Sequence, residues 1–292
     1  LRSAAWSLLI GLSVLTHQGL SSSALDEERA IAAFWQQMAW RATGIAPGTT
    51  LLVRYPGIDY GSDSDVVWGP ANLIYHPEPQ AGLPVRVPVS ALTWERQTLN
   101  AVLAGRGARE DTYRSHSMSI DYSQVLIAVQ SAPDACVRVL DPRWQMFSVN
   151  DDPALRALAS ASRVDALESD GPPVRPPASL FGPEPQRRWC YYFQQAAAAA
   201  QGGDWRGVAA LQDELGALGL HPNDQIEWMP FLQAQAALGD LQAVKEIASR
   251  LNSERLYRQQ ACQNLRGMGG QGYALPDAMQ TEVDELFCGG AQ

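Results

Sequence analysis

The stretch that decides the fold of this chain is WCYYFQQAAAAAQGGDWRGVAALQDELGALG, residues 189–219. A second stretch with the same pattern, EWMPFLQAQAALGDLQAVKEIASRL, occupies residues 227–251, so that Gly239 repeats Gly203 at an offset of 36 positions. The apolar residues keep this register: Tyr192 falls on Trp228, Val208 on Val244 and Leu215 on Leu251. A fixed period of about this length is typical of helix–turn–helix repeats, which stack because a single pair of helices cannot bury its apolar face.

Capping signals divide each repeat into two helices. Asp204 and Asp240 each follow a glycine and suit the N-cap of a second helix. Asp224 and Glu227 have the spacing of a capping box at the start of the second repeat. The pattern predicts first helices over 189–201 and 227–238, and a degenerate third pair over 255–265 and 277–287.

These features predict that residues 187–292 are TPR-like helical hairpins. Hairpins of this kind pack and dock other segments, and no residue of the pattern carries catalytic chemistry. We therefore expect a protein partner, if the chain has one, to bind on the hairpins.

The region before the hairpins, residues 47–168, has a different pattern. Short apolar runs alternate with Pro, Gly and Asp turns, which is typical of strands. Strands are expected at 49–55, 66–68, 71–75, 85–89, 124–130, 136–140, 146–149 and 163–167. Helices are expected at 92–104, capped by Ser90, and after Asp152-Pro153. This mixture predicts an α/β domain and, for the whole chain, the α+β class.

Two further segments complete the predicted organisation. Residues 169–186 contain many prolines and are expected to form a semi-rigid linker between the two domains. Residues 21–46 are expected to hold an amphipathic helix, because Ile31, Phe34 and Met38 recur at helical spacing. Residues 1–20 include the apolar run AAWSLLIGLSVLT, which is shorter than an ideal membrane span of about 20 residues. It is expected to be either the remnant of a membrane helix or a signal-like segment.

Composition argues against nucleic acid as a partner, and it does not decide whether the cysteines form disulfides. The net charge is −9 and the isoelectric point about 4.9, so binding to nucleic acid is disfavoured by electrostatic repulsion. The four cysteines form no C-x-x-C pair, which argues against a zinc or redox motif of that type. In an exported chain they permit two disulfides, with Cys262–Cys288 and Cys136–Cys190 as the suggested pairs, and four free buried thiols as the alternative.

The search for chemistry in the sequence gives one weak candidate site. Asp59, Asp63 and Asp65 alternate in GIDYGSDSD, and carboxylates on a loop can gather around Ca²⁺, although the spacing is not that of an EF-hand and a solvated turn is favoured. The four histidines have no metal-binding spacing, and no nucleophile elbow, Walker loop or dinucleotide fingerprint is present. No catalytic residue and no cofactor are therefore predicted. Four aromatic residues are candidates for a sugar-binding surface, because aromatic rings stack on sugar rings, but packing in the core is favoured for them: Trp68, Trp94, Trp144 and Tyr75.

Several blocks of the sequence resemble a known family. They are FWQQMAWRATGIAPGTTLL (34–52), VVWGPANLIY (66–75), CVRVLD (136–141), FGPEPQRRWCYYFQQA (181–196), GDW (203–205) and PNDQIEWMPFLQA (222–234). Together they look like the C-terminal, extracytoplasmic region of uncharacterised multi-spanning membrane proteins of Chloroflexi-type bacteria. The resemblance implies a membrane half similar to polytopic, lipid-linked-sugar glycosyltransferases. Because that half would carry the catalytic carboxylates, no transferase residue is assigned to this chain.

These observations lead to a hypothesis and two alternatives. The hypothesis is an accessory or docking region outside the cytoplasm, tethered to the cell membrane through the N-terminal segment, in a glycosyltransferase-like protein. The first alternative is an independent protein-binding module, membrane-tethered or secreted, with no link to glycan transfer. The second is a free-standing hydrolase, which would need a cleft that the sequence does not reveal.

Overall fold

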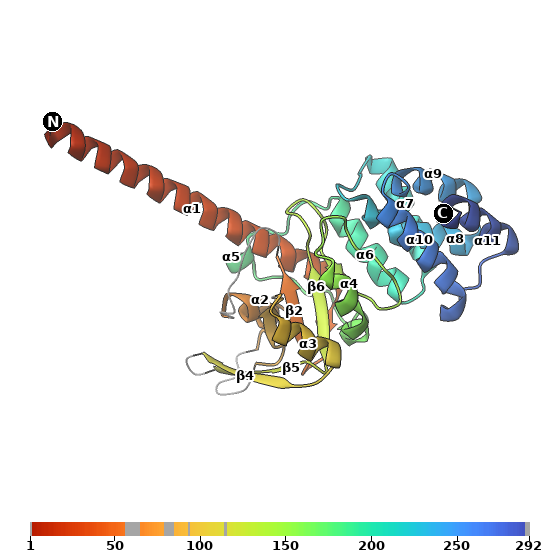
Figure 1. Cartoon of the computed structure of the whole chain (residues 1–292), viewed down its shortest axis with the longest axis horizontal. Coiled ribbons are helices and arrows are strands. Elements are labelled where there is room, and N and C mark those ends of the chain that lie inside the picture. The colour runs from red at the N-terminus through yellow and green to blue at the C-terminus, as the bar shows by residue number, and fades with distance from the viewer. Residues whose placement is uncertain (1, 56–64, 79–84, 93, 114–115, 290–292) are drawn as a thin grey trace.

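The computed structural model describes residues 2–55, 65–78, 85–92, 94–113 and 116–289. Figure 1 shows three parts: a long N-terminal helix that projects from the molecule, a body of strands and helices, and an all-helical body at the C-terminal end. The chain therefore belongs to the α+β class, as its sequence predicts.

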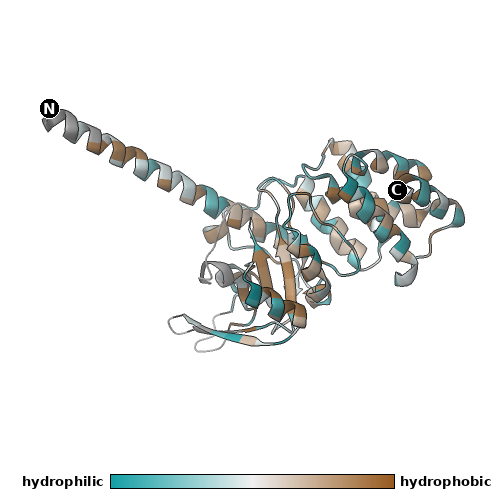
Figure 2. Ribbon diagram, in the orientation of Figure 1, coloured by the Kyte–Doolittle hydropathy of each residue, from teal (hydrophilic) through white to brown (hydrophobic). Residues whose placement is uncertain are grey.

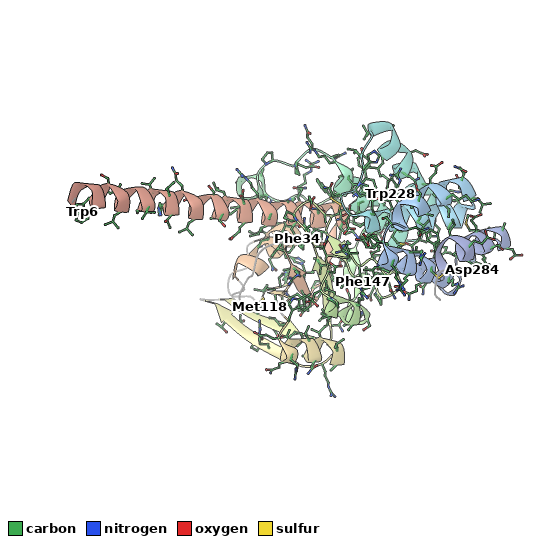
Figure 3. All side chains as sticks on the ribbon, turned by 45° about the horizontal axis from the view of Figure 1, so that its top comes forward. Trp6, Phe34, Met118, Phe147, Trp228 and Asp284 are labelled. Carbon is green, nitrogen blue, oxygen red and sulfur yellow. A yellow bond between two sulfur atoms is a disulfide. The ribbon has the colours of Figure 1, made fainter. Side chains whose placement is uncertain are left out.

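The N-terminal helix α1 (Arg2–Arg41) is one uninterrupted element. The sequence predicted two segments here, 1–20 and 21–46, but the structure joins most of both in a single helix. Its outer part is exposed, with Trp6 and Leu15 each 66% accessible, whereas Phe34 near its inner end is fully buried. Figure 3 shows Trp6 at the free end and Phe34 where the helix enters the body. No helix in the described ranges reaches the length and mean hydropathy of a membrane span.

The central body is built around a parallel sheet. Among the described residues, its strands lie in the order β3-β2-β6-β7, and only β7 runs antiparallel to its neighbour. The strands are β2 (Thr50–Arg54), β3 (Val89–Ala91), β6 (Val125–Val129) and β7 (Arg138–Val139). Two antiparallel pairs lie beside the sheet: β1 (Gly44–Ile45) with β8 (Leu167–Glu168), and β4 (Ala108–Tyr113) with β5 (His116–Asp121). The helices of this body are α2 (Asp65–Tyr75), α3 (Arg96–Ala104) and α4 (Ala154–Leu158).

Both faces of the sheet are covered, which explains why β6 and the middle of β2 are continuously apolar (Figure 2). Leu51 and Val53 point to the face covered by α1 and α2, where they join Phe34 in one core cluster. Leu52 points to the opposite face and packs with Val102 of α3. Because side chains alternate across a strand, successive residues of β2 enter two different cores. The inner end of α1 is therefore an integral part of the central body.

Several local predictions for this body are wrong. Residues 66–68 and 71–75 lie in the helix α2 instead of in strands, and the run 71–75 buries Ala71, Ile74 and Tyr75 at helical spacing. Short apolar runs do not by themselves distinguish a buried helix from a buried strand. The helix expected at 92–104 begins at Arg96 and lacks the Ser90 cap. The hairpin β4–β5 has no counterpart in the predicted elements, and residues 146–149 form no strand.

The C-terminal body consists of helices that follow one another in antiparallel contact. They are α6 (Trp189–Gln201), α7 (Trp205–Leu218), α8 (Met229–Leu238), α9 (Leu241–Leu251), α10 (Arg255–Gly267) and α11 (Asp277–Val283), the last followed by a π-helical turn (Asp284–Cys288). The predicted caps are confirmed: Asp204 accepts a hydrogen bond from Gly207 N, and Asp240 accepts one from Ala243 N. The predicted capping box is only half formed, because the Glu227 side chain binds Cys136 N instead of returning to residue 224.

The predicted linker does not separate the two bodies. Residues 169–186 include the short helix α5 (Ala178–Phe181), and Val174 and Phe181 pack on the core beneath α1. The helix α6 lies directly against α1, as Figure 1 also shows. A disulfide between Cys136 and Cys190 joins the bodies covalently, and a second one joins Cys262 to Cys288. These are the two pairs that the sequence analysis suggested.

Candidate functional site

The junction between the central body and the helical body contains a concentration of buried polar side chains, among them Gln37, Gln194 and Glu227. Side-chain amides bind backbone atoms here, both within the central body and across the junction. Gln37 of α1 accepts a hydrogen bond from Val137 N at 2.8 Å, and Gln194 of α6 donates to Val137 O at 2.6 Å. Gln195 donates to Trp40 O at 2.6 Å. Because buried backbone groups must be paired, these amides fix the position of α6 against α1 and the edge of the sheet.

A second set of side chains explains why residues 146–149 are not a strand. Gln260 of α10 accepts from Phe147 N at 2.6 Å and donates to Phe147 O at 2.9 Å. Asn264 makes the same pair of bonds with Gln145, and the Tyr257 hydroxyl accepts from Val149 N. Alternate residues of the extended segment therefore pair with side chains one helical turn apart, as they would with a neighbouring strand. The helical body thus holds a segment of its own chain, here called the clasped segment (residues 145–149).

Replacing Gln260 with leucine should lower the free energy of unfolding by about 1–3 kcal/mol, because it leaves the Phe147 amide and carbonyl buried without partners. Gln242→Leu is the matched control, since Gln242 is an exposed helical glutamine. Chemical denaturation of both variants measures the difference. Equal stabilities for the two would show that the clasp contributes nothing.

A buried ion pair lies beside the clasped segment. Arg138 of β7 and Asp151 are 1% and 4% accessible, and the guanidinium binds both carboxylate oxygens, at 2.7 and 2.8 Å. Arg138 also donates to Met146 O, and Asp151 accepts from Ser148 N. Burial alone would lower the pKa of Arg138, but the hydrogen bonds and charge of Asp151 outweigh it and raise the pKa. Arg138 therefore stays charged, and its bonds to Asp151 and Met146 O fix the path of the chain before α4.

Glu227 is another buried ionisable group at the junction. Its side chain is 1% accessible, and its Oε1 accepts from Cys136 N at 2.7 Å while Oε2 lies 3.1 Å from the Cys136 sulfur. Burial raises its pKa to about 8, the Cys136 N–H opposes this, Asp224 adds to it, and Arg138 opposes it. Asp224 in turn accepts a 2.6 Å hydrogen bond from the Tyr257 hydroxyl. Both sulfurs near Glu227 are bonded to each other and so are not available as metal ligands.

Two hollows open on either side of a pair of aromatic rings at this junction. Trp40 of α1 and Tyr191 of α6 meet edge to face with centroids 5.3 Å apart, and both rings line both hollows. The first hollow has a volume of about 390 Å³ and is also lined by Cys190 and His221. The second, of about 340 Å³, is lined by several charged residues: Arg41, Arg175, Glu184 and Arg187. Aromatic rings beside arginine and carboxylate groups suit a ligand with apolar faces and polar or anionic substituents. We call this the junction site.

Local interactions orient the residues of the junction site. The Arg187 guanidinium lies 4.5 Å from the Tyr191 ring centroid, and Trp40 Nε1 donates to Glu184 Oε1 at 3.3 Å. Arg41 donates to Gln201 Oε1, and burial lowers its pKa to about 10 despite the opposing charge of Asp141. These contacts bring the proline-rich segment, α1 and α6 together at one place.

The residues singled out in the sequence lie elsewhere. Asp59 and Asp63 are outside the described residues, and Asp65 begins α2 with its side chain also outside them. Tyr75 is buried and donates to Met38 O at 2.9 Å, and Trp144 is buried 6.5 Å from the Trp205 ring, so neither belongs to a sugar-binding floor. Trp94 instead stacks under Arg54. The structure therefore does not bring Tyr75, Trp94 and Trp144 together in a ligand surface.

The sequence analysis did not identify the residues that form the junction. A detectable signal was present: Gln37 and Gln194 interrupt otherwise apolar helix faces, and Glu227 sits within the apolar sequence IEWMPFL. A polar residue at a core position indicates a buried hydrogen bond, but it does not reveal the partner.

Comparisons of the chain with protein-family models, with curated proteins and with solved structures find no match.

Proposed function

We propose that this chain is an extracytoplasmic accessory module of a membrane protein that resembles polytopic glycosyltransferases. In this proposal α1 is the tether, the helical body is a TPR-like array, and the junction site presents a substrate or docks a partner. The observation that carries the proposal is the continuity of α1. One helix runs from an exposed apolar segment into the core of the central body, so whatever holds its outer end also positions the body.

Two further observations support this location. The exposed outer part of α1 has large apolar side chains on all sides, including Leu9, Ile10 and Leu15, and such a surface is stable only when something covers it. Both disulfides are typical of chains that fold outside the reducing cytosol. Trp40 and Arg41, which line the junction site, belong to the same helix, so a ligand bound there would sit at a fixed distance from the tether.

The helical body supports the TPR-like part of the proposal. The helices form consecutive pairs, α6 with α7 and α8 with α9. The second helix of each pair has an aspartate N-cap at the equivalent position, Asp204 and Asp240. The clasped segment is held through its backbone atoms, which is how a peptide-docking surface binds an extended chain.

Replacing both Leu9 and Leu15 with aspartate should reduce membrane binding of the chain at least tenfold. On insertion scales a leucine-to-aspartate change in a membrane helix costs about 3 kcal/mol per position. The measurement is flotation of the full chain with vesicles of phosphatidylethanolamine and phosphatidylglycerol. Leu218→Asp is the matched control, because Leu218 is as exposed as Leu9, 57% for both, but lies on α7. A wild-type chain that stays with the soluble fraction would overturn the tether.

The clasped segment also favours the alternative, an independent protein-binding module without a link to glycan transfer, since it shows backbone capture by the helical body. The coding sequence immediately upstream of Leu1 separates the two. An open frame with many apolar helices supports the accessory module. A stop codon there would leave the independent module as the better explanation.

A further inference from the structure

The disulfide Cys136–Cys190 differs from the other disulfide in its surroundings. Cys136 precedes β7 and is fully buried, whereas Cys190 is half-buried and lines the first hollow of the junction site. Within the described part of the chain, this is the cysteine pair that has a carboxylate oxygen within 4.8 Å of both sulfurs. One cysteine of this disulfide therefore lines an opening, and the other lies against a buried acid.

The acid is Glu227, whose two carboxyl oxygens have different partners. Oε1 already accepts the Cys136 N–H, and Oε2 is 3.1 Å from the Cys136 sulfur. A disulfide sulfur carries no proton, so a hydrogen bond across this distance requires the proton to be on Oε2. Burial, which raises the pKa of Glu227 to about 8, keeps the carboxyl protonated at neutral pH, and the charged or titratable groups that influence it are Asp224 and Arg138.

The outer sulfur is placed where a thiolate is stabilised. Cys190 is the second residue of the 13-residue helix α6, so its sulfur lies at the positive end of the helix. Arg188 and His221 line the same hollow and add positive charge or hydrogen-bond donors. The opening is about 390 Å³, which is enough for a small thiol to reach this sulfur.

We propose that Cys136–Cys190 is an exchangeable disulfide, in which an external thiol reacts at Cys190 through the hollow and Glu227 supplies and retrieves the proton of Cys136. This inference does not depend on the tether or on glycan transfer. It assigns a covalent modification site to the junction, with thiol-bearing small molecules or proteins as its class of reactant.

The steps balance as follows for an external thiol as the reductant. Its thiolate attacks the Cys190 sulfur, a new bond forms between these two sulfurs, and the Cys136–Cys190 bond breaks with its electron pair on Cys136. The Glu227 Oε2 proton moves to the Cys136 sulfur, so a thiol forms instead of a buried thiolate. A second external thiolate then attacks its partner sulfur, releases the Cys190 thiolate and leaves as the external disulfide. In reoxidation, the Cys190 thiolate attacks the external disulfide, forms the mixed disulfide and releases one external thiolate. The Glu227 carboxylate then takes the proton from Cys136, and the resulting Cys136 thiolate attacks the Cys190 sulfur and releases the second external thiolate.

The test measures both disulfides of the full chain at once. The chain is treated with dithiothreitol, quenched with an alkylating reagent at a series of times, and digested so that each cysteine pair is quantified by mass spectrometry. Glu227→Gln keeps the shape of the side chain and can still accept the Cys136 N–H, but it has no proton to transfer. We expect this variant to react at least tenfold more slowly at Cys136–Cys190 at pH 7, with an unchanged rate at Cys262–Cys288, which serves as the internal control.

Two additional readouts make the outcome decisive. With limiting glutathione, the mixed disulfide should map to Cys190, and the wild-type rate should inflect near pH 8 in a way that the variant does not. Glu227→Asp keeps a carboxyl group but moves it away from the Cys136 sulfur, so its rate should lie between those of the wild type and Glu227→Gln. The aspartate variant also serves as the test if Glu227→Gln does not fold. A Cys136–Cys190 rate that no Glu227 substitution alters, or an adduct on Cys136, would overturn the proposal.

Discussion

The free energy of unfolding of the Glu227→Gln variant should exceed that of the wild type by an amount that grows between about pH 5 and pH 8. In the folded chain burial raises the pKa of Glu227 from its ordinary value of 4.5 to about 8. Between these two values the unfolded chain releases the proton and the folded chain keeps it. The wild type therefore loses about 1.4 kcal/mol of stability for each pH unit in this window, several kcal/mol in all.

The sign follows from which state holds the proton. Below pH 4.5 both states are protonated, and the ionisation of Glu227 has no effect on stability. As the pH rises toward 8 stability is lost, and above 8 both states are ionised and the loss is complete. Glutamine does not titrate, so the variant lacks this dependence. The difference between the two proteins isolates Glu227, because every other titrating group is common to both.

Urea denaturation at several pH values between 4 and 9 measures this difference. Glu254→Gln is the matched control, since Glu254 is exposed and the same change there should give curves parallel to those of the wild type. A Glu227→Gln curve that also runs parallel to the wild type would mean that Glu227 is ionised in the folded chain. That result would remove the proton on which the hydrogen bond to the disulfide depends.

Arg138→Met is the second substitution with a large expected effect, a loss of about 3–5 kcal/mol of stability. It leaves the Asp151 carboxylate in the interior without the guanidinium that binds both its oxygens, and an unpaired buried charge is strongly destabilising. It also leaves Met146 O without its donor, so the chain before α4 should lose order. Hydrogen exchange measures this loss of order, and the backbone amides of residues 146–151 should exchange faster in the variant than in the wild type.

The double variant Arg138→Met/Asp151→Asn tests whether the unpaired charge is the cause. It should recover a large part of the stability, because the neutral amide can still accept the Ser148 N–H. Arg163→Met is the control: Arg163 also binds both oxygens of an aspartate, Asp165, but this pair is exposed and its loss should have little measurable effect. If Arg138→Met were as mild as Arg163→Met, the buried pair would contribute nothing to the fold.

Periodicity and caps were sufficient to predict the helical body. The helix α6 has the predicted bounds, 189–201, and the caps at Asp204 and Asp240 form as expected. Signals of this kind are local, because a helix pairs its own backbone and its cap lies within the same turn. The strands β2 and β6 were also predictable, since each is a continuous apolar run between turn residues.

The sequence by itself therefore determined the α+β class, the helical hairpins, the acidic charge and the cysteine pairs to be considered. Only the tertiary structure decided that α2 is a helix, that Arg2–Arg41 form one helix, and that the clasped segment pairs with α10. It also decided that the Glu227 side chain does not complete the predicted capping box but contacts Cys136 of the Cys136–Cys190 disulfide. The reason is physical, because each of these features depends on residues far away in the chain. A polar residue at a core position indicates that a hydrogen-bond partner is needed, but it does not identify that partner.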